Sequence, residues 1–156
     1  MSANIGKNFE ERFKLDWKNS FPDSFILRLP DQMSGYKSSS NLCDFICFNK
    51  NILYLIECKA HKGASLPFTN ITQYDKIKMK VGIPGIRAGI VLWLYEKDKV
   101  FYIPISTITK MKEDGKKSVG LKAIEEGYNI IEIPSEKLVI YMRSDYSCLQ
   151  FLKEGE

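Results

Sequence analysis

Three charged side chains, Asp44, Glu57 and Lys59, interrupt two segments that are otherwise almost wholly apolar. They follow the pattern Asp-x12-Glu-x-Lys within the run CDFICFNKNILYLIECK. Burying charge is costly unless a partner or a metal ion compensates it. A divalent cation held by carboxylates lowers the pKa of a bound water and neutralises charge that builds on a phosphoryl oxygen. These residue types therefore indicate metal-dependent phosphodiester chemistry.

The two apolar segments, residues 42–48 and 52–58, are rich in Ile, Phe, Leu and Tyr, as strands are. Asn tolerates the positive φ that tight hairpins need, so the Asn-Lys-Asn run between the segments predicts a turn. We take Lys50 and Asn51 as its two central residues. This register makes Asn49 face Ile52 and continues outward along both strands.

Extended along the hairpin, the register places Asp44 opposite Glu57, with Lys59 on the same face because side chains alternate along a strand. Directly opposed Cβ atoms lie about 5 Å apart, and two carboxylates at that distance repel unless a cation lies between them. Hard oxygen ligands suit Mg²⁺ or Mn²⁺. A slip of one residue would separate the acids. The alternative interpretation is a structural hairpin in which Lys59 only neutralises Glu57.

Length and composition indicate one ordinary globular domain over residues 1–156, with 44% hydrophobic and 27% charged residues. No apolar run reaches the roughly 18 residues of a membrane span, and the polar start MSANIGKNFEERF is unlike a secretory signal. We expect a cytoplasmic protein without a membrane partner or a small-molecule cofactor. The net charge of +4 permits nucleic-acid binding without requiring it.

The four cysteines, Cys43, Cys47, Cys58 and Cys148, lack the spacing of a zinc site. In the proposed register Cys43 and Cys58 would face each other on the side away from the acids. Without an export signal we expect reduced thiols in the core.

The remaining pattern predicts helices alternating with strands. Apolar residues every four positions predict a helix over residues 4–20. The other predicted elements are a short strand within 21–29, a loop at 30–41, a loop at 61–68, a helix at 70–80, strands at 88–95 and 99–105, helices at 106–112 and 121–128, strands at 130–133 and 138–142 separated from each other by the turn PSEK, and a helical turn at 147–152. This order predicts the α/β class, a mixed central sheet flanked by helices.

Several segments resemble the PD-(D/E)XK nuclease superfamily, and within it the RecU-type Holliday-junction resolvases. The matching segments are Gly-Lys-Asn-Phe-Glu at residues 6–10, Cys-Asp-Phe at 43–45, Ile-Glu-Cys-Lys at 56–59, and Ser-Leu-Pro-Phe with Asn-Ile at 65–71. The match is clear over residues 6 to 80. The strands predicted at 88–95 and 99–105 fit the family order without a specific motif.

The resemblance implies a restriction-endonuclease-like fold and a homodimeric Mg²⁺-dependent (or Mn²⁺-dependent) endonuclease that cuts symmetric strands at four-way DNA junctions, in a bacterial cell or encoded by a phage. It assigns Asp44 and Glu57 as metal ligands and Lys59 as the group that stabilises the transition state. It assigns Glu10 as an acid on the first helix that completes the site. From the sequence alone, a solvated helix acid is an equal interpretation of Glu10.

The sequence departs from the family pattern in three places. Where the family has a glutamine that reaches the metal-bound water, this chain has Asp75, with Gln73 two residues earlier, and either could take the position. Leu42 replaces a hydroxyl residue that often contacts the metal. The loop at 33–41 is shorter and less basic than the family's projecting stalk, so junction specificity is less supported than nuclease chemistry.

Basic residues near the predicted site are candidates for phosphate contacts. They are Lys37, Lys62, Lys76, Lys80 and Arg87. A second basic group is interrupted by acids, and we interpret it as a solvated face: Lys110, Lys112, Lys116, Lys117 and Lys122.

Three functions fit the sequence. The first is a structure-selective endonuclease for four-way junctions, acting in recombination and repair. The second is a nuclease of the same chemistry that cuts flapped or linear duplex DNA. The third is a DNA-binding protein without catalytic activity, in which Asp44, Glu57 and Lys59 are paired structurally.

Overall fold

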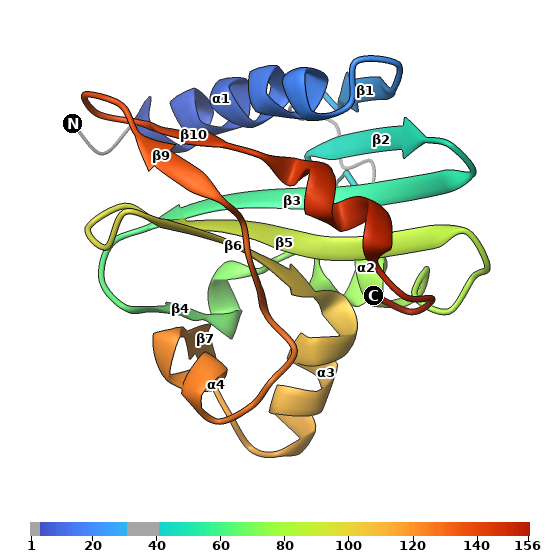
Figure 1. Ribbon diagram of the computed structural model, residues 1–156. Helices are drawn as coiled ribbons and strands as arrows, with labels where there is room; N and C mark the ends of the chain where they lie inside the picture. The colour runs from blue at the N-terminus through green and yellow to red at the C-terminus, as the bar shows by residue number, and fades with distance from the viewer. Residues whose placement is uncertain (1–3, 31–40) are drawn as a thin grey trace, which may run out of the picture.

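The computed structural model describes residues 4–30 and 41–156, and Figure 1 shows its elements along the chain. In order they are α1 (Ile5–Ser20), β1 (Phe25–Arg28), β2 (Phe45–Asn49), β3 (Ile52–His61), β4 (Ser65–Pro67), η2 (Phe68–Asn70), α2 (Tyr74–Lys78), β5 (Ile86–Leu94), β6 (Lys99–Pro104), α3 (Ile105–Glu113), β7 (Ser118–Gly120), α4 (Leu121–Glu125), β8 (Ile131–Glu132), β9 (Ser135–Lys137), β10 (Met142–Ser144) and η3 (Tyr146–Phe151).

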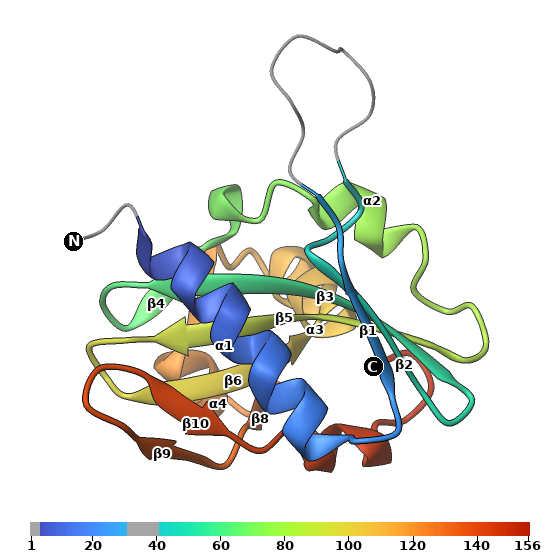
Figure 2. The same cartoon turned by 90° about the horizontal axis from the view of Figure 1, so that it is seen from above.

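A six-stranded sheet in the order β1-β2-β3-β5-β6-β8 forms the centre of the fold. Only the β3–β5 pair is parallel among its described strands; the other pairs are antiparallel, so the sheet is mixed. Figure 2 shows the helices distributed on both sides of this sheet. The predicted α/β class, with a mixed central sheet flanked by helices, is confirmed. No helix in the described parts of the chain has the length and apolar character needed to cross a bilayer.

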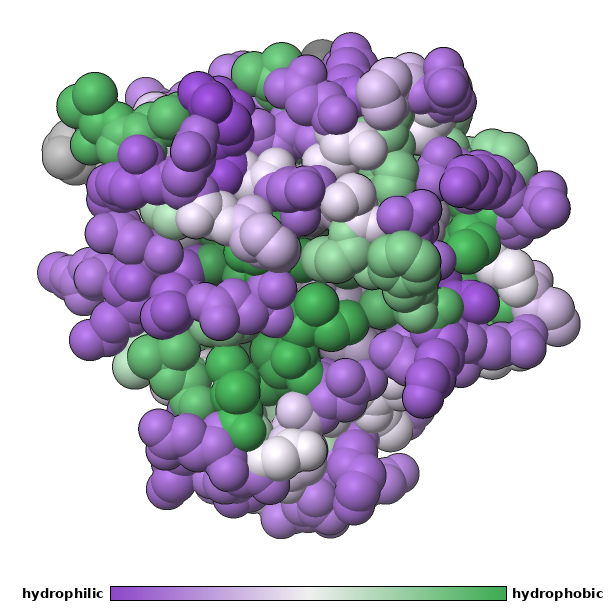
Figure 3. Space-filling view, in the orientation of Figure 1, coloured by the Kyte–Doolittle hydropathy of each residue, from purple (hydrophilic) through white to green (hydrophobic). Residues whose placement is uncertain are grey.

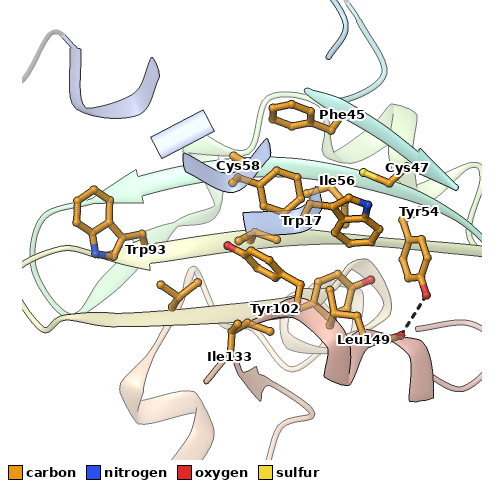
Figure 4. Packing of buried hydrophobic residues seen from close by; sticks show 14 of the residues in the cluster. Trp17, Phe45, Cys47, Tyr54, Ile56, Cys58, Trp93, Tyr102, Ile133 and Leu149 are labelled. Atoms are coloured by element: carbon orange, nitrogen blue, oxygen red, sulfur yellow. Dashed lines mark hydrogen bonds between the residues drawn. The ribbon is translucent and has the colours of Figure 1, made fainter. Parts of the chain in front are cut away.

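One face of the sheet packs against α1, β10 and η3. The four-residue spacing of Phe9, Phe13 and Trp17 places all three on the buried side of α1, as predicted. The Trp17 ring lies 5.1 Å from the Tyr54 ring of β3, and Tyr54 donates a hydrogen bond to the Leu149 carbonyl of η3 (Figure 4). Aromatic packing therefore links the first helix, the sheet and the C-terminal segment.

The other face packs against α2, α3 and the small β4–β7 sheet. Tyr74 and Ile77 of α2 and Ile108 of α3 are buried there with Leu55 of β3 and Ile90 of β5. β5 is buried along most of its length because both faces of the sheet are covered, as its apolar run predicts.

The segment after β3 differs from the prediction. β3 continues to His61, and Ser65–Pro67 forms β4 instead of a loop, pairing with β7. The helix predicted at 70–80 is limited to Tyr74–Lys78, after the 3₁₀ turn Phe68–Asn70. Ile71, at φ −97° and ψ 76°, lies outside the helical region, so the chain between the 3₁₀ turn and Tyr74 does not continue as one helix.

The predicted turn PSEK was also wrong. Ser135–Lys137 forms β9, which pairs with β10, and the Ser135 and Ser144 hydroxyls lie 2.8 Å apart across the pair. The turn lies at residues 138–141, where Val139 is 95% and Ile140 62% exposed. Figure 3 shows this hairpin tip as green atoms at the upper left. β-Branched residues predict strands because they pack well on sheets, and here they occupy a turn.

The cysteines are free thiols, as predicted, with Cys43, Cys47 and Cys58 buried. The predicted opposition of Cys43 and Cys58 was wrong. Cys43 packs with α2 and α3 on one side of the sheet, and Cys58 packs with α1 on the other. The regular part of β2 begins only at Phe45, so strand alternation does not extend back to Cys43.

Gly89 of β5 gives a test of core packing. A Cβ at this position would lie 2.4 Å from the ring of Tyr102, which is fully buried. We expect Gly89→Ala to lower the free energy of unfolding by about 1–3 kcal/mol, as overpacking does. Urea denaturation measures this change. Gly6→Ala in α1, where a Cβ would meet no atom within 4 Å, is the matched control and should be neutral or stabilising. Equal stability of both variants would show that the Tyr102 ring can move.

Candidate active site

The β2–β3 hairpin has the predicted register. Asn49 pairs with Ile52, Phe48 with Leu53, and the ladder continues to Phe45 opposite Ile56. Lys50 in the turn has φ +48°. Asp44 directly precedes β2, and its backbone N–H donates to the Ile56 carbonyl at 3.1 Å. Asp44 is therefore held beside Glu57.

Glu57 is the more deeply buried of the two acids, with 2% of its surface exposed. Its Oε1 lies 3.4 Å from the Lys59 Nζ. Its Oε2 is buried and accepts no hydrogen bond from the described residues. Asp44 is better satisfied, because its Oδ2 accepts the backbone N–H of Cys58 at 2.8 Å.

Burial raises the pKa values of both carboxyl groups. The pKa of Glu57 rises to about 8, first through desolvation and then through the negative charge of Asp44, with Lys59 opposing the rise. Desolvation also raises the pKa of Asp44, against the Cys58 N–H and the charges of Lys59 and Arg28. The nearby Lys59 ammonium does not compensate for the desolvation of the two adjacent acids. An additional cation would lower both pKa values.

Arg28 of β1 is a site neighbour that the sequence analysis did not identify. Its guanidinium binds the Glu10 carboxylate of α1 (2.6 Å and 2.8 Å), and in the sheet it pairs with Phe45, the residue after Asp44. Its positive charge lowers the pKa of Asp44. Glu10 therefore lies at the margin of the site and contacts it through Arg28. The sequence signal that could have identified Arg28 as part of the site is a charged residue inside the otherwise apolar segment FILRL.

The other proposed metal ligands are not joined to the two acids. Gln73 precedes α2, and Asp75 is exposed in its first turn. No contact among the described residues links either side chain to Asp44 or Glu57. Nor do three His, Cys, Asp or Glu side chains of the described chain form a group that could hold a metal. The structure thus brings together two carboxylates and Lys59.

The candidate DNA-binding residues are dispersed. Lys37 lies within 31–40, outside the described residues. Lys62 is exposed and lies 3.8 Å from Glu96. Lys76 belongs to α2, and Lys80 is exposed just after it. Arg87 of β5 pairs in register with Tyr54, and its Nε donates to the Leu152 carbonyl at 3.4 Å. Arg87 therefore contacts the C-terminal segment, on the face of the sheet opposite α2.

The raised pKa of Glu57 predicts a pH dependence for the metal-free protein. A carboxyl group whose pKa is higher in the folded state stabilises the fold at low pH, and this contribution is lost as pH rises from about 4.5 through about 8. We expect Glu57→Gln to lose less stability than the wild type as pH rises from about 4.5 to about 8. Urea denaturation with a chelator measures the difference. Glu96→Gln, at an exposed glutamate, should retain the wild-type pH dependence; an equal response of both variants would rule out Glu57 as the source.

Comparison with known proteins places the chain in a family. The family model of RecU, described as Recombination protein U, matches residues 27–144, which include Arg28, Asp44, Glu57 and Lys59 but not α1. No curated protein matches the chain.

Among solved structures, the chain resembles Hjc, a Holliday junction resolvase from the archaeal hyperthermophile Archaeoglobus fulgidus. The TM-score is 0.56 with 18% identity, over 80% of this chain and 95% of that chain. This similarity supports the fold. Because the family match spans most of the sequence, the protein belongs to the RecU family, as the motifs in its first half indicate.

Proposed function

We propose that this protein is a divalent-metal-dependent endonuclease that resolves four-way DNA junctions by cutting two symmetric strands. Membership of the RecU family supports the reaction class. The similarity of the fold to an archaeal Holliday junction resolvase agrees with it. The single observation that carries the chemistry is the carboxyl pair formed by the buried Glu57 and the partly buried Asp44, with Lys59 3.4 Å from Glu57.

The residues fit a divalent cation. Glu57 Oε2 is a buried acceptor without a partner among the described residues, and both acids have raised pKa values. Asp44 and Glu57 would hold Mg²⁺ or Mn²⁺ through oxygen atoms, as these ions prefer. When bound, the ion supplies charge neutralisation at the phosphoryl group and a more acidic water.

The other groups orient the reaction. The Cys58 N–H fixes one oxygen of Asp44 and so directs the carboxylate toward Glu57. The Lys59 ammonium can contact a non-bridging oxygen of the scissile phosphate, where negative charge grows as water attacks phosphorus and the bond to one sugar oxygen breaks. Glu10 acts as a positioning residue, because it holds Arg28 next to the Asp44 strand.

Cleavage assays test the proposal. With Mg²⁺ or Mn²⁺ we expect paired symmetric nicks in a labelled four-way junction, with little cutting of flap, linear duplex or single strand. Asp44→Asn and Lys59→Ala should each lower the single-turnover rate by about 100-fold or more.

Asp75→Asn is the matched control for Asp44→Asn, since it makes the same chemical change at an exposed acid on α2. We expect a rate close to that of the wild type. A large loss would instead make Asp75 part of the site. Comparable cutting of linear duplex would support the second function above, and tight DNA binding without metal-dependent cleavage would contradict the nuclease proposal.

Symmetric cleavage of two strands requires two sites at a fixed separation, so the proposal includes a homodimer. An apolar surface on β1 and β2 supports it. Phe25 pairs in register with Phe48, and these two side chains and Leu27 are 54%, 47% and 46% exposed. Phe48 pairs in turn with Leu53, which lies on the same face of β3 as Glu57. A second copy covering this surface would bring both active sites to one side of the dimer.

We expect the double variant Phe25→Asp/Phe48→Asp to be monomeric in light scattering and to make single, unpaired nicks in a junction. Burying two carboxylates in an apolar interface is strongly unfavourable. Phe151→Asp, at a residue 78% exposed on η3, is the control and should remain dimeric. A double variant that still dimerises would place the interface elsewhere.

A further inference from the structure

Two lysines from different helices lie over one aromatic ring. The Nζ of Lys112, on α3, lies 3.9 Å from the ring centroid of Tyr74 on α2, and the Nζ of Lys78 lies 5.7 Å from the same centroid. The Tyr74 and Thr109 hydroxyls are hydrogen-bonded at 2.7 Å, which fixes α2 against α3. The two ammonium groups therefore cannot be more than about 10 Å apart.

Neither lysine has a carboxylate partner among the described residues, although both are exposed. Their neighbours differ in this respect: Lys110 lies 3.3 Å from Asp114, and Lys116 lies 2.7 Å from Glu126. The interaction with the ring attracts each cation, but the two cations repel each other. An anion bound by both ammonium groups would remove that repulsion.

The lysine pair lies on the same side of the sheet as the acids. Tyr74 belongs to the apolar cluster that contains Cys43 and Leu55. Cys43 directly precedes Asp44 in the sequence, and Leu55 lies two residues before Glu57. Glu57 alternates with Leu55 along β3 and therefore shares its face. A DNA backbone bound at the acids can continue across α2 toward α3 without crossing the sheet.

We propose that Lys78 and Lys112 together bind the phosphate backbone of a duplex arm outside the active site. The identity of this anion as DNA rests on the proposed function. Successive phosphates of one strand are about 3.4 Å apart along the helix axis, so the pair can contact adjacent phosphates. Lys110 and Lys116 remain a solvated, acid-neutralised face, as expected for the second basic group. Lys112 does not belong to that face.

The test uses the full chain without divalent metal and measures binding to a labelled four-way junction and to linear duplex as salt rises. The slope of log K against log salt is negative, and each lost phosphate contact reduces its magnitude by about 1. Lys78→Ala/Lys112→Ala should therefore reduce the magnitude by about 2 on both DNAs. Lys110→Ala/Lys116→Ala removes the same formal charge and should leave the slope nearly unchanged. Lys78→Arg/Lys112→Arg should retain the wild-type slope.

The result separates this inference from the proposed function. A slope equal to that of the wild type in the double alanine variant, with the thermal melting temperature unchanged, overturns the phosphate contacts even if the protein cuts junctions. Equal slope changes in the two alanine pairs also overturn it, because the effect would then be general charge. A selective change in the Lys78/Lys112 variant supports it even if the wild type cuts no DNA.

Discussion

The burial of Glu57 next to the partly buried carboxyl group of Asp44 is the constraint on which the rest of the structure depends. Asp44 and Glu57 are held beside each other by a hairpin register, and Glu57 is almost fully removed from solvent. This arrangement costs folding free energy, because desolvation favours the neutral acids. The packing on both faces must therefore hold the hairpin against that cost. Aromatic residues of α1 do so on one face and α2 with α3 on the other.

The local charges are arranged so that the acids are close to cations without being fully neutralised. The Lys59 ammonium lies 3.4 Å from Glu57. Arg28 lowers the pKa of Asp44 through its charge, while its guanidinium binds the Glu10 carboxylate. If Arg28 were unpaired, its charge would favour the ionised form of Asp44 more strongly. Glu10 partly neutralises Arg28, so this acid on the first helix is linked to Asp44 through the Arg28 guanidinium.

Sequence reasoning predicted the parts of the fold that depend on local pattern. The turn at Lys50 and the alternation of side chains determined the hairpin register, and the spacing of Phe9, Phe13 and Trp17 determined α1. It did not predict the contact between Arg28 and Glu10, which joins a strand to a helix and has no local signature. The chain leaves the helical conformation at Ile71, which the apolar spacing does not signal, so the positions of Gln73 and Asp75 relative to the acids did not follow from the sequence. β9 was missed because its residues, Ser-Glu-Lys, are typical of a turn.

The difference between local sequence pattern and tertiary contacts also explains why counting lysines does not identify a DNA-binding surface. The net charge of +4 is small, and many of the basic residues are paired with acids within the described structure. A lysine already paired with a carboxylate contributes less to phosphate binding, since the bound anion must compete with its partner. Arg87 is a candidate by sequence position, yet the sheet places it on the side of the C-terminal segment. Cations without an acidic partner on the Glu57 side of the sheet are therefore the groups with which a DNA backbone can pair at least cost, and the strand and helix packing decides which lysines these are.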